Sequence, residues 1–518
     1  MAFVQASLFD PAIPLKARQN ALKRALSDPG IPTTPTTTSF WLKQPHQKLA
    51  KTQSLTLPSQ AEIVIIGSGI TGTSIARTLL QESGGQRKDV SNPKIVILEA
   101  RDTCSGATGR NGGHILETVE EFVDFEAKYG LEAAKKITRF RLAHLPEILK
   151  VADEYGLAEE SQTRNVQFLS AYFDEEKWQG SVRCIQRFKE CMPEEAAEWK
   201  IFEREDIPEK FGLPTARGVV AGPAGALWPY RFVTGVLARL HQEFPEELCV
   251  ETNTPVTAIH NDRNQSTSNF PYSVVTARGT IRTRHIIHCT NAHVGHLIPG
   301  LRGRIYPIRG QMSAQNAGVK FRDQGKEHSW LFNYERGFDY LTQLPSGGQA
   351  DAAKMMFGGG FAQGQTGGVA DIGLSTDSEL SFYADIHLSG ALSSIFGREN
   401  WGAVSGPSVE QMWTGSMGFS ADGNPWVGKL PPSATQRGGD QDSHGAEWVA
   451  CAFSGEGMVQ AWLCGKALAL MVLDHDQGSS GPKDLSWFPE QLLVTEDRLQ
   501  KSVLPGSVDD GNPMCTNG

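Results

Sequence analysis

The 518-residue sequence has no CxxC pair, no long apolar run and no excess of basic residues. Its eight cysteines are scattered, so neither a metal site nor a disulfide framework is expected. Reduced thiols in an intracellular, cytoplasmic compartment are the default expectation. No segment approaches the roughly 18 apolar residues of a membrane span. The net charge of −9 leaves no positive surplus for phosphates, which argues against a nucleic-acid partner.

Targeting signals and repeats are also missing. The start, MAFVQASLFDPAIPL, has neither the basic first residues nor the continuous apolar core of a signal peptide. The terminal CTNG fits a prenylation box poorly and is expected to be a disordered tail. With 39% hydrophobic and 21% charged residues, the composition is that of a globular protein. A chain of this length is too large for one ordinary core, so two domains are expected.

The most informative segment is AEIVIIGSGITG, at residues 61–72. Its apolar part predicts a strand, and the helix-like ITGTSIARTLL follows the glycines. Gly67 allows a tight strand-to-helix turn, Gly69 lets the backbone approach a pyrophosphate, and Gly72 lets helix and strand pack closely. The helix N-terminus then offers N–H groups and a positive dipole end to phosphates.

A second apolar segment, KIVILEA, carries the acid Glu99 as its last residue but one. A carboxylate at the tip of a strand can accept hydrogen bonds from a ribose diol. A lone GxGxxG is a weak signal, because glycine-rich turns are common. Strand, glycines, helix, second strand and terminal acid in this order predict a bound dinucleotide.

Two more glycine-rich segments favour a flavin. SGATGRNGGH, at 105–114, follows the acid-tipped strand closely, where backbone would have to pass near an isoalloxazine ring; the alternative is a flexible loop. FSGEGM, at 453–458, predicts a strand-glycine-helix turn whose helix N-terminus could stabilise the negative charge of a reduced ring. An ordinary turn is the alternative there. No second GxGxxG is present for a nicotinamide donor.

The rest of the pattern indicates the organisation of the chain. A basic helix over 15–26 precedes a Pro/Thr-rich arm that should lie on the globule. Helical patterning dominates 120–214, and strand-like alternation over 304–365 suggests an antiparallel sheet. The last 40 residues look like a surface appendage.

Together these segments resemble the FAD-dependent oxidoreductases of the D-amino-acid oxidase superfamily, most closely the bacterial gamma-glutamylputrescine oxidases and their fungal relatives. The resemblance spans about residues 38–475. It rests on SFWL, IVIIGSGITG with Glu99, SGATGRNGGH, LWPYRFVTGVLARL, TNAHVGHLIPGLRGRIYPIRGQM, WTGSMGFSADGNPWVG and FSGEGM.

The family implies an α/β fold. A Rossmann-like FAD-binding domain of the glutathione-reductase type would be interleaved with an α+β substrate domain that has a mixed or antiparallel sheet. The expected division is an N-terminal extension, 1–58; the FAD-binding domain, 59–118, 215–300 and 400–478; the substrate domain, 119–214 and 301–399; and a C-terminal tail, 479–518.

The resemblance also implies roles for single residues. The pyrophosphate would lie at the glycine turn, the ribose at Glu99, the adenine near Arg101 and the backbone of Val256, and the ring between the other two glycine segments. The expected FAD-binding residues are Gly67, Gly69, Ile70, Thr71, Gly72, Glu99, Ala100, Arg101, Ser105, Gly106, Ala107, Thr108, Asn111, Gly112, Gly113, Val256, Gly455, Gly457 and Met458.

Two departures from related branches matter. Sarcosine oxidases and amadoriases attach flavin through a cysteine at the position that resembles Gln411, so FAD should be non-covalent here. They also carry a lysine that promotes reaction with oxygen. The best register places Met356 there, with Lys354 two residues away on the same strand face, which makes oxidase behaviour less secure than flavin binding.

The chemistry that such a site performs is hydride removal from a carbon next to nitrogen. The catalytic candidates are Arg110 and His114 from the glycine loop, with Tyr340 and Trp413 from the opposing wall; an aromatic wall suits an amine. For each of the four, a purely packing role is the alternative.

The expected substrate is a small amine or amino acid, oxidised to an imine, with O₂ as acceptor and H₂O₂ as product. The alternatives are a dehydrogenase that passes electrons to another acceptor and a non-catalytic flavin-binding protein. His293 and His296 are expected to be structural. Arg309 could pair with a substrate carboxylate or form a salt bridge at the domain junction.

Overall fold

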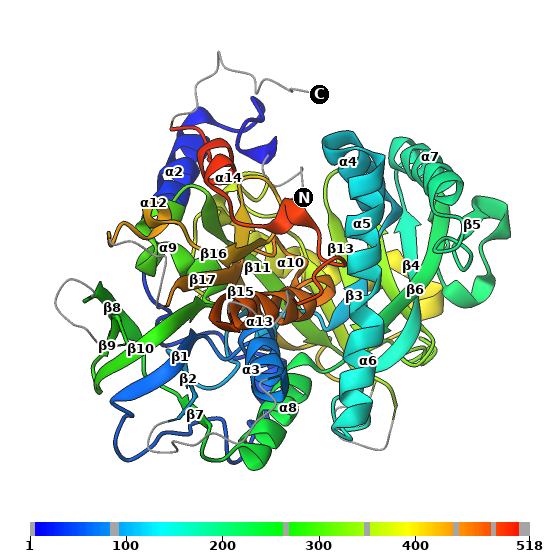
Figure 1. Ribbon diagram of the computed structural model, residues 1–518. Coiled ribbons are helices and arrows are strands. Elements are labelled where there is room, and N and C mark those ends of the chain that lie inside the picture. Colours follow the sequence, from blue (N-terminus) through cyan, green and yellow to red (C-terminus); the bar gives the residue numbers. More distant parts are fainter. Residues whose placement is uncertain are drawn as a thin grey trace.

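Two β-sheets, one of eight strands and one of nine, form the framework of the protein. The computed structural model describes residues 6–82, 93–262, 269–346, 353–438, 445–477 and 483–506. Figure 1 shows helices on both sheets and N- and C-terminal segments that lie close together beside the eight-stranded sheet. The predicted α/β class, with a second, mixed sheet, is confirmed.

Parallel strands make up the centre of the eight-stranded sheet. The strand before the glycine turn, β1 (Gln60–Ile66), lies between β2 and β10 and is parallel to both. Every residue of β2 is buried, as expected for a strand covered on both faces. The strands of this sheet are β1, β2 (Ile95–Leu98), β7 (Leu248–Glu251), β8 (Val256–Asn261), β9 (Tyr272–Thr276), β10 (Gly279–His288), β16 (Trp426–Lys429) and β17 (Glu447–Cys451).

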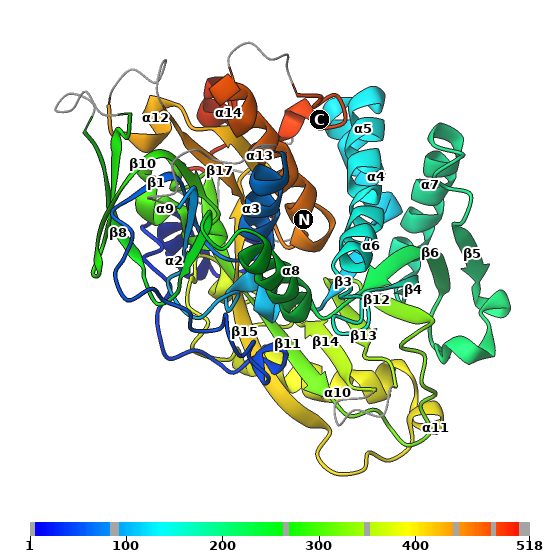
Figure 2. The same cartoon turned by 60° about the horizontal axis from the view of Figure 1, so that its bottom comes forward.

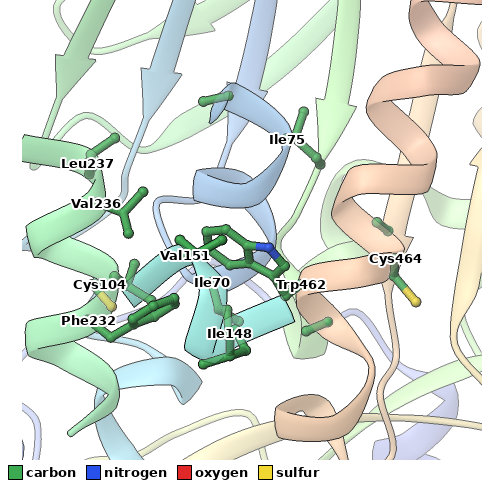
Figure 3. Close-up of a cluster of buried hydrophobic side chains, with 14 of the residues drawn as sticks. Ile70, Ile75, Cys104, Ile148, Val151, Phe232, Val236, Leu237, Trp462 and Cys464 are labelled. Atoms are coloured by element: carbon green, nitrogen blue, oxygen red, sulfur yellow. The ribbon is translucent and has the colours of Figure 1, made fainter. Parts of the chain in front are cut away.

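Three helices pack over one face of this sheet: α3 (Ile70–Glu82), α8 (Pro229–Glu243) and α13 (Ala461–Gln477). Figure 3 shows the indole of Trp462, on α13, among Ile70 of α3 and Val151 of α6. The Ser74 hydroxyl on α3 donates to the Trp462 carbonyl over 2.6 Å. This packing fixes the N-terminal end of α3, where the glycine turn ends.

The nine-stranded sheet is antiparallel except where β4 and β12 run parallel. Helices cover both faces of its β4–β6 end (Figure 2). On one side lie α4 (Val119–Tyr129) and α7 (Glu175–Cys191), and on the other lies α10 (Phe382–Ile395). Its strands are β3 (His114–Leu116), β4 (Arg164–Tyr172), β5 (Lys200–Glu203), β6 (Gly218–Ala226), β11 (Ile305–Gln315), β12 (His328–Asn333), β13 (Phe338–Gln343), β14 (Met355–Gly359) and β15 (Val409–Ser420).

The expected helical region 120–214 is helical only in part, because β4 and β5 interrupt it. The second half of β4 is buried continuously, so it lacks the alternation that marks a strand in the sequence. The remaining α-helices of the described chain are α2 (Leu15–Leu26), α4 (Val119–Tyr129), α5 (Leu131–Leu142), α6 (His144–Glu154), α7 (Glu175–Cys191), α9 (Val294–Leu297), α10 (Phe382–Ile395), α11 (Arg398–Trp401), α12 (Pro432–Thr435) and α14 (Glu496–Lys501).

Some chain segments contribute strands to both sheets, although the expected division assigns each segment to one domain. Strands β3, β6 and β15 belong to the nine-stranded sheet, although the segments expected to form the FAD-binding domain contain them. The chain therefore crosses between the sheets within those segments. The domain boundaries themselves stay a prediction.

Both ends of the described chain pack on the globule. The predicted helix over 15–26 is present as α2, which buries Leu22 against Tyr306. The expected surface appendage is packed as well, because Phe488 and Leu492 are buried and Arg498 pairs with Asp422 over 2.7 Å. The expected disordered CTNG end lies outside the described residues. No described helix is both long enough and apolar enough to cross a bilayer.

We expect Trp462→Ala to lower the free energy of unfolding by about 3–5 kcal/mol, because it leaves a cavity between α3 and α6. Denaturant titration at a fixed FAD concentration measures the change. Leu55→Ala is the control, since Leu55 is fully exposed and its truncation should alter stability by less than about 0.5 kcal/mol. Equal unfolding midpoints for the two variants would contradict this account of the core.

Candidate functional site

A pocket lies at the carboxyl ends of the parallel strands β1, β2 and β10. Ile66, Leu98 and Cys289, at or just after the ends of these strands, all line it. In open α/β sheets, ligands bind in the crevice outside the carboxyl ends of the strands. The topology therefore places a binding site where the sequence predicts a dinucleotide.

Most of the residues expected to bind the cofactor line this pocket, although they come from five separate parts of the chain. Gly72, which lies in α3, and Ser105, Gly112 and Gly113 of the glycine loop do not line it. The expected residues that do line it are Gly67, Gly69, Ile70, Thr71, Glu99, Ala100, Arg101, Gly106, Ala107, Thr108, Asn111, Val256, Gly455, Gly457 and Met458.

The turn from β1 to α3 has no space for side chains. A Cβ atom on Gly72 would lie 2.1 Å from the Gly67 carbonyl oxygen, and one on Gly67 would lie 2.7 Å from the Cys289 carbonyl oxygen. Gly67 also has a φ of +114°, a backbone conformation that glycine adopts without strain. Strand and helix thus approach each other as the fingerprint requires, and the N-terminus of α3 faces the pocket.

Glu99 is held in a defined orientation at the end of β2. One carboxylate oxygen, Oε2, accepts from the Ser68 hydroxyl over 2.7 Å and from the Ser68 N–H over 3.2 Å. The other, Oε1, accepts from the Arg101 N–H over 3.0 Å. A carboxylate offers about four acceptor positions, so an additional O–H donor can still bind. Its place in the pocket suits the predicted ribose contact.

The glycine loop 105–114 is fixed from several sides. The Ser39 hydroxyl donates to the Gly109 carbonyl over 2.7 Å, and the Trp41 indole N–H donates to the Asn111 carbonyl. A Cβ on Gly112 would lie 2.5 Å from the ring of Tyr340. The loop is therefore part of the packed structure, which argues against the alternative of a freely flexible loop.

Arg110 and Trp413 both stabilise the loop. Arg110 is buried and donates to the carbonyl of Thr37 over 2.9 Å and to that of Thr414 over 2.8 Å. It also pairs with Asp377. The buried Trp413 indole donates to the Arg110 carbonyl over 2.8 Å. Neither side chain lines the pocket.

His114 and Tyr340 do not line the pocket either, and they differ in their hydrogen bonds and pKa. The His114 Nε2 lies 2.7 Å from the Ser329 hydroxyl, and burial together with the nearby Arg164 cation lowers its pKa to about 3. His114 is therefore neutral near pH 7. Burial, with a smaller effect of Asp339, raises the pKa of Tyr340. Its hydroxyl has no hydrogen bond to any described residue and remains a proton donor. A catalytic role stays a prediction for all four candidates.

The C-terminal glycine segment is braced by a buried ion-pair cluster. Arg141 donates to Glu456, within FSGEGM, over 2.6 Å and also pairs with Glu117. Burial raises the pKa of Glu117 to about 7, although Arg141 acts in the opposite direction. No sequence pattern indicates this role for Arg141, because its helix reads as an ordinary amphipathic one.

The strand that resembles the oxygen-reactive segment of related branches has no free lysine. The ammonium of Lys354 lies 2.7 Å from a Glu410 carboxylate oxygen and 2.6 Å from the Asn316 side-chain oxygen. Met356 is fully buried on β14. Arg309 pairs with Asp371 over 2.7 Å, as expected for the salt-bridge alternative.

Three buried polar atoms in the pocket wall have no hydrogen-bond partner among the described residues. They are Arg101 Nε, Thr290 Oγ1 and Ser416 Oγ. Buried polar groups are rarely left unpaired, so these atoms indicate a polar ligand with phosphate or hydroxyl groups. The narrow glycine turn, the carboxylate and these unpaired atoms together fit FAD. Of the three residues that carry these atoms, only Arg101 is expected from the sequence to lie at the site.

The described residues contain one cluster with metal-ligating atoms close together: His285, His475 and Asp476. His285 Nδ1 accepts from the N–H of Ala446 over 3.0 Å, so its Nε2–H donates to Asp476 over 2.9 Å. Arg284 binds the same carboxylate oxygen. His285, Asp476 and Arg284 thus pair with one another, and an arginine on the shared carboxylate does not suit a metal site, although the buried His475 Nδ1 has no hydrogen-bond partner among the described residues. The seven cysteines of the described residues are free thiols.

Residues 62–471 match the family described as FAD dependent oxidoreductase (DAO). The chain belongs to this family. It is an FAD-dependent oxidoreductase, and the assignment of the pocket to FAD stays a prediction. A search among curated proteins found no match.

The matches with solved structures of similar fold include nearly the whole of each solved chain. Glycine oxidase from Geobacillus kaustophilus is 15% identical, with a TM-score of 0.58, covering 84% of this chain and 99% of its own. L-proline dehydrogenase from P. horikoshii is 19% identical, with a TM-score of 0.58, covering 84% and 97%. NikD, described as an unusual amino acid oxidase, is 14% identical, with a TM-score of 0.57, covering 86% and 99%. At these identities the likeness shows the fold, and the narrower resemblance to gamma-glutamylputrescine oxidases stays a prediction.

We expect Glu99→Ala to weaken FAD binding by about 1–3 kcal/mol, the scale of losing a hydrogen bond to a charged group. The Kd measured by flavin fluorescence on the apoprotein checks this. Glu243→Ala, an exposed acid at the end of α8, is the control and should leave the Kd unchanged. A Kd for Glu99→Ala equal to that of the control would argue against the ribose contact.

Proposed function

We propose that this enzyme oxidises a C–N bond of an amine or amino acid to an imine, with O₂ as the acceptor and H₂O₂ as the product. The observation that carries the proposal is the Tyr340 ring against Gly112, in the loop that the family resemblance places beside the flavin ring. Neighbours of the same fold include a glycine oxidase, an iminodiacetate oxidase and an L-proline dehydrogenase, all named for amino compounds.

Bound FAD supplies a hydride acceptor for a carbon next to nitrogen. In this proposal Gly67, Gly69 and Thr71 hold the pyrophosphate, Glu99 holds the ribose, and Met458 contacts the ring edge. These contacts fix the cofactor against the sheet that carries Tyr340. Orientation of the substrate C–H toward the cofactor is then the main contribution of the protein.

The wall around the glycine loop excludes water. Met312 and Trp413 are buried, and the Tyr340 ring packs on Gly112. An aromatic ring and a thioether offer an apolar surface to a neutral amine, and the Tyr340 hydroxyl can donate one hydrogen bond to it.

Neither titratable candidate of the loop is suited to take a proton from the substrate. Arg110 is occupied by Thr37, Thr414 and Asp377. His114 is a poor base, since burial and Arg164 lower its pKa to about 3. The substrate therefore has to reach the ring as a neutral amine.

A dehydrogenase that passes electrons to a different acceptor is the second candidate. The observation that favours it is Lys354, which is held by Glu410 and Asn316. A cation near the ring would help reduction of oxygen by stabilising negative charge. Without it, reaction with oxygen would be slow while amine oxidation proceeds.

We expect anaerobic mixing with a suitable amine or amino acid to bleach the visible flavin absorbance. Re-admitted air should restore the absorbance and produce H₂O₂, which a peroxidase assay measures. Reoxidation by dyes alone would favour the dehydrogenase. Rapid bleaching by NADH or NADPH, with no response to any amine, would contradict the proposal.

The released flavin should be free FAD after heat or acid treatment, because Gln411 offers no thiol.

The rate of anaerobic bleaching at low substrate concentration should rise about tenfold per pH unit below the pKa of the amine, which is about 10 for an alkylamine. The lowered pKa of His114 keeps that residue neutral throughout this range, so the inflection belongs to the substrate. Stopped-flow absorbance with two amines of different pKa tests this. An inflection that stays at the same pH for both would assign it to the enzyme instead.

A further inference from the structure

The N-terminal arm, defined here as residues 28–37, forms part of the FAD pocket. Gly30, Ile31 and Pro32 line the pocket together with Gly67 and Glu99. The family match begins at residue 62, so the arm lies outside the part of the chain that the family accounts for. In Figure 1, helix α2, which precedes the arm, lies beside α9, whose residues also contribute to the pocket.

Hydrogen bonds hold the first half of the arm. The carboxylate of Asp28 accepts from Arg302 over 2.7 Å and lies 3.0 Å from His296 Nδ1. The Pro29 carbonyl accepts from the Ser375 hydroxyl over 2.7 Å. The Gly30 carbonyl accepts from Nδ1–H of His293 over 2.9 Å. Because His293 and His296 themselves line the pocket, this half of the arm is attached directly to the pocket wall.

The second half is held by the loop that the family places at the flavin ring. Arg110 donates to the Thr36 hydroxyl over 2.9 Å and to the Thr37 carbonyl over 2.9 Å. The Thr37 N–H donates to the Asp377 carbonyl over 2.8 Å. Arg101 donates to the Thr33 carbonyl over 3.3 Å. Each part of the arm thus contacts a residue that borders the cofactor site.

Asp377 connects the arm to both arginines. Its carboxylate binds Arg101 through two hydrogen bonds of 2.8 and 2.9 Å and lies 3.1 Å from Arg110 Nε. All three side chains are at least nine-tenths buried. Two cations share one anion, so this cluster has a formal excess of one positive charge.

The unpaired Nε of Arg101 is the independent sign that a ligand belongs here. It has no hydrogen-bond partner among the described residues, and Arg101 lines the pocket beside the arm. A diphosphate offers anionic oxygens that would both accept from such a donor and balance the excess charge. The arm and the Arg101–Asp377 pair are therefore placed at the anionic part of a bound dinucleotide, in place of the adenine contact that the family resemblance implies for Arg101.

We propose that residues 28–37 and Asp377 form the outer wall of the FAD site and that FAD dissociates only after the arm detaches. The arm is then a cofactor-retaining element of this chain, additional to the glycine turn that the family shares. Its role concerns the bound FAD alone and is independent of the substrate. Release of the cofactor is accordingly a test that needs no turnover.

The test measures the rate constant for FAD release from the holoenzyme, by flavin fluorescence after dilution into cofactor-free buffer. Asp28→Ala with Ser375→Ala removes contacts of the arm without altering a pocket-lining residue. We expect release to accelerate at least tenfold. Asp10→Ala is the matched control: it breaks an ion pair of the N-terminal segment with Arg336, away from the pocket, and should leave the rate unchanged.

Hydrogen exchange of the amides in 28–37 reports whether the arm has detached. Thr36→Val and Thr37→Val are added to the double variant until these amides exchange faster than in the wild-type protein. A variant with a faster-exchanging arm and a wild-type rate of FAD release would overturn the proposal. Deletion of residues 1–37 gives a second measurement, and a folded deletion variant that retains FAD as long as the wild-type protein would also overturn it.

Discussion

Backbone crowding at the start of α3 is the constraint on which the site depends. No side chain fits at Gly72, because the Gly67 carbonyl oxygen already occupies the space where a Cβ would lie. From the other side, a Cβ on Gly465 of α13 would lie 2.8 Å from the Thr71 carbonyl oxygen. The first turn of α3 is thus confined between strand β1 and helix α13, which holds its free N–H groups in a single orientation.

The electrostatics of the site differ from those of the whole protein. The chain carries a net charge of −9, yet Arg101 and Arg110 share the single carboxylate of Asp377 at the pocket. Burial and the neighbouring Arg101 cation lower the pKa of Arg110 to about 10, while Asp377 opposes them, so the guanidinium stays charged near pH 7. The local positive charge favours an anionic ligand once that ligand is enclosed in the pocket. The overall negative charge of the protein, by contrast, gives no long-range attraction to an anion.

Sequence predicts the parts of this structure that depend on residues near one another in the chain. Gly67, Gly69, Gly72 and Glu99 lie within one β-α-β unit, so their spacing alone predicts a role in binding a dinucleotide. The helix over 15–26 is likewise present with the predicted bounds. The glycine segments at 105–114 and 453–458 are recognisable for the same local reason, and residues of both line the pocket.

Contacts between distant parts of the chain could not be predicted in this way. Arg110 looks like a catalytic candidate in its loop, but its partners Thr37, Asp377 and Thr414 come from three other segments. Strand β4 has no alternating pattern, because its second half is buried on both faces between α4 and α10. The position of Tyr340 on Gly112 depends on the crossing of two sheets, which no local pattern records.

The pocket draws on residues from Gly30 to Ala461, nearly the whole length of the described chain. During synthesis, β1 and the glycine turn leave the ribosome long before β17 and the C-terminal glycine segment exist. Chains generally begin to fold from the N-terminal side as they emerge. A growing chain of this enzyme therefore lacks part of this pocket for most of its translation, and the pocket can enclose a ligand only once the C-terminal glycine segment has folded.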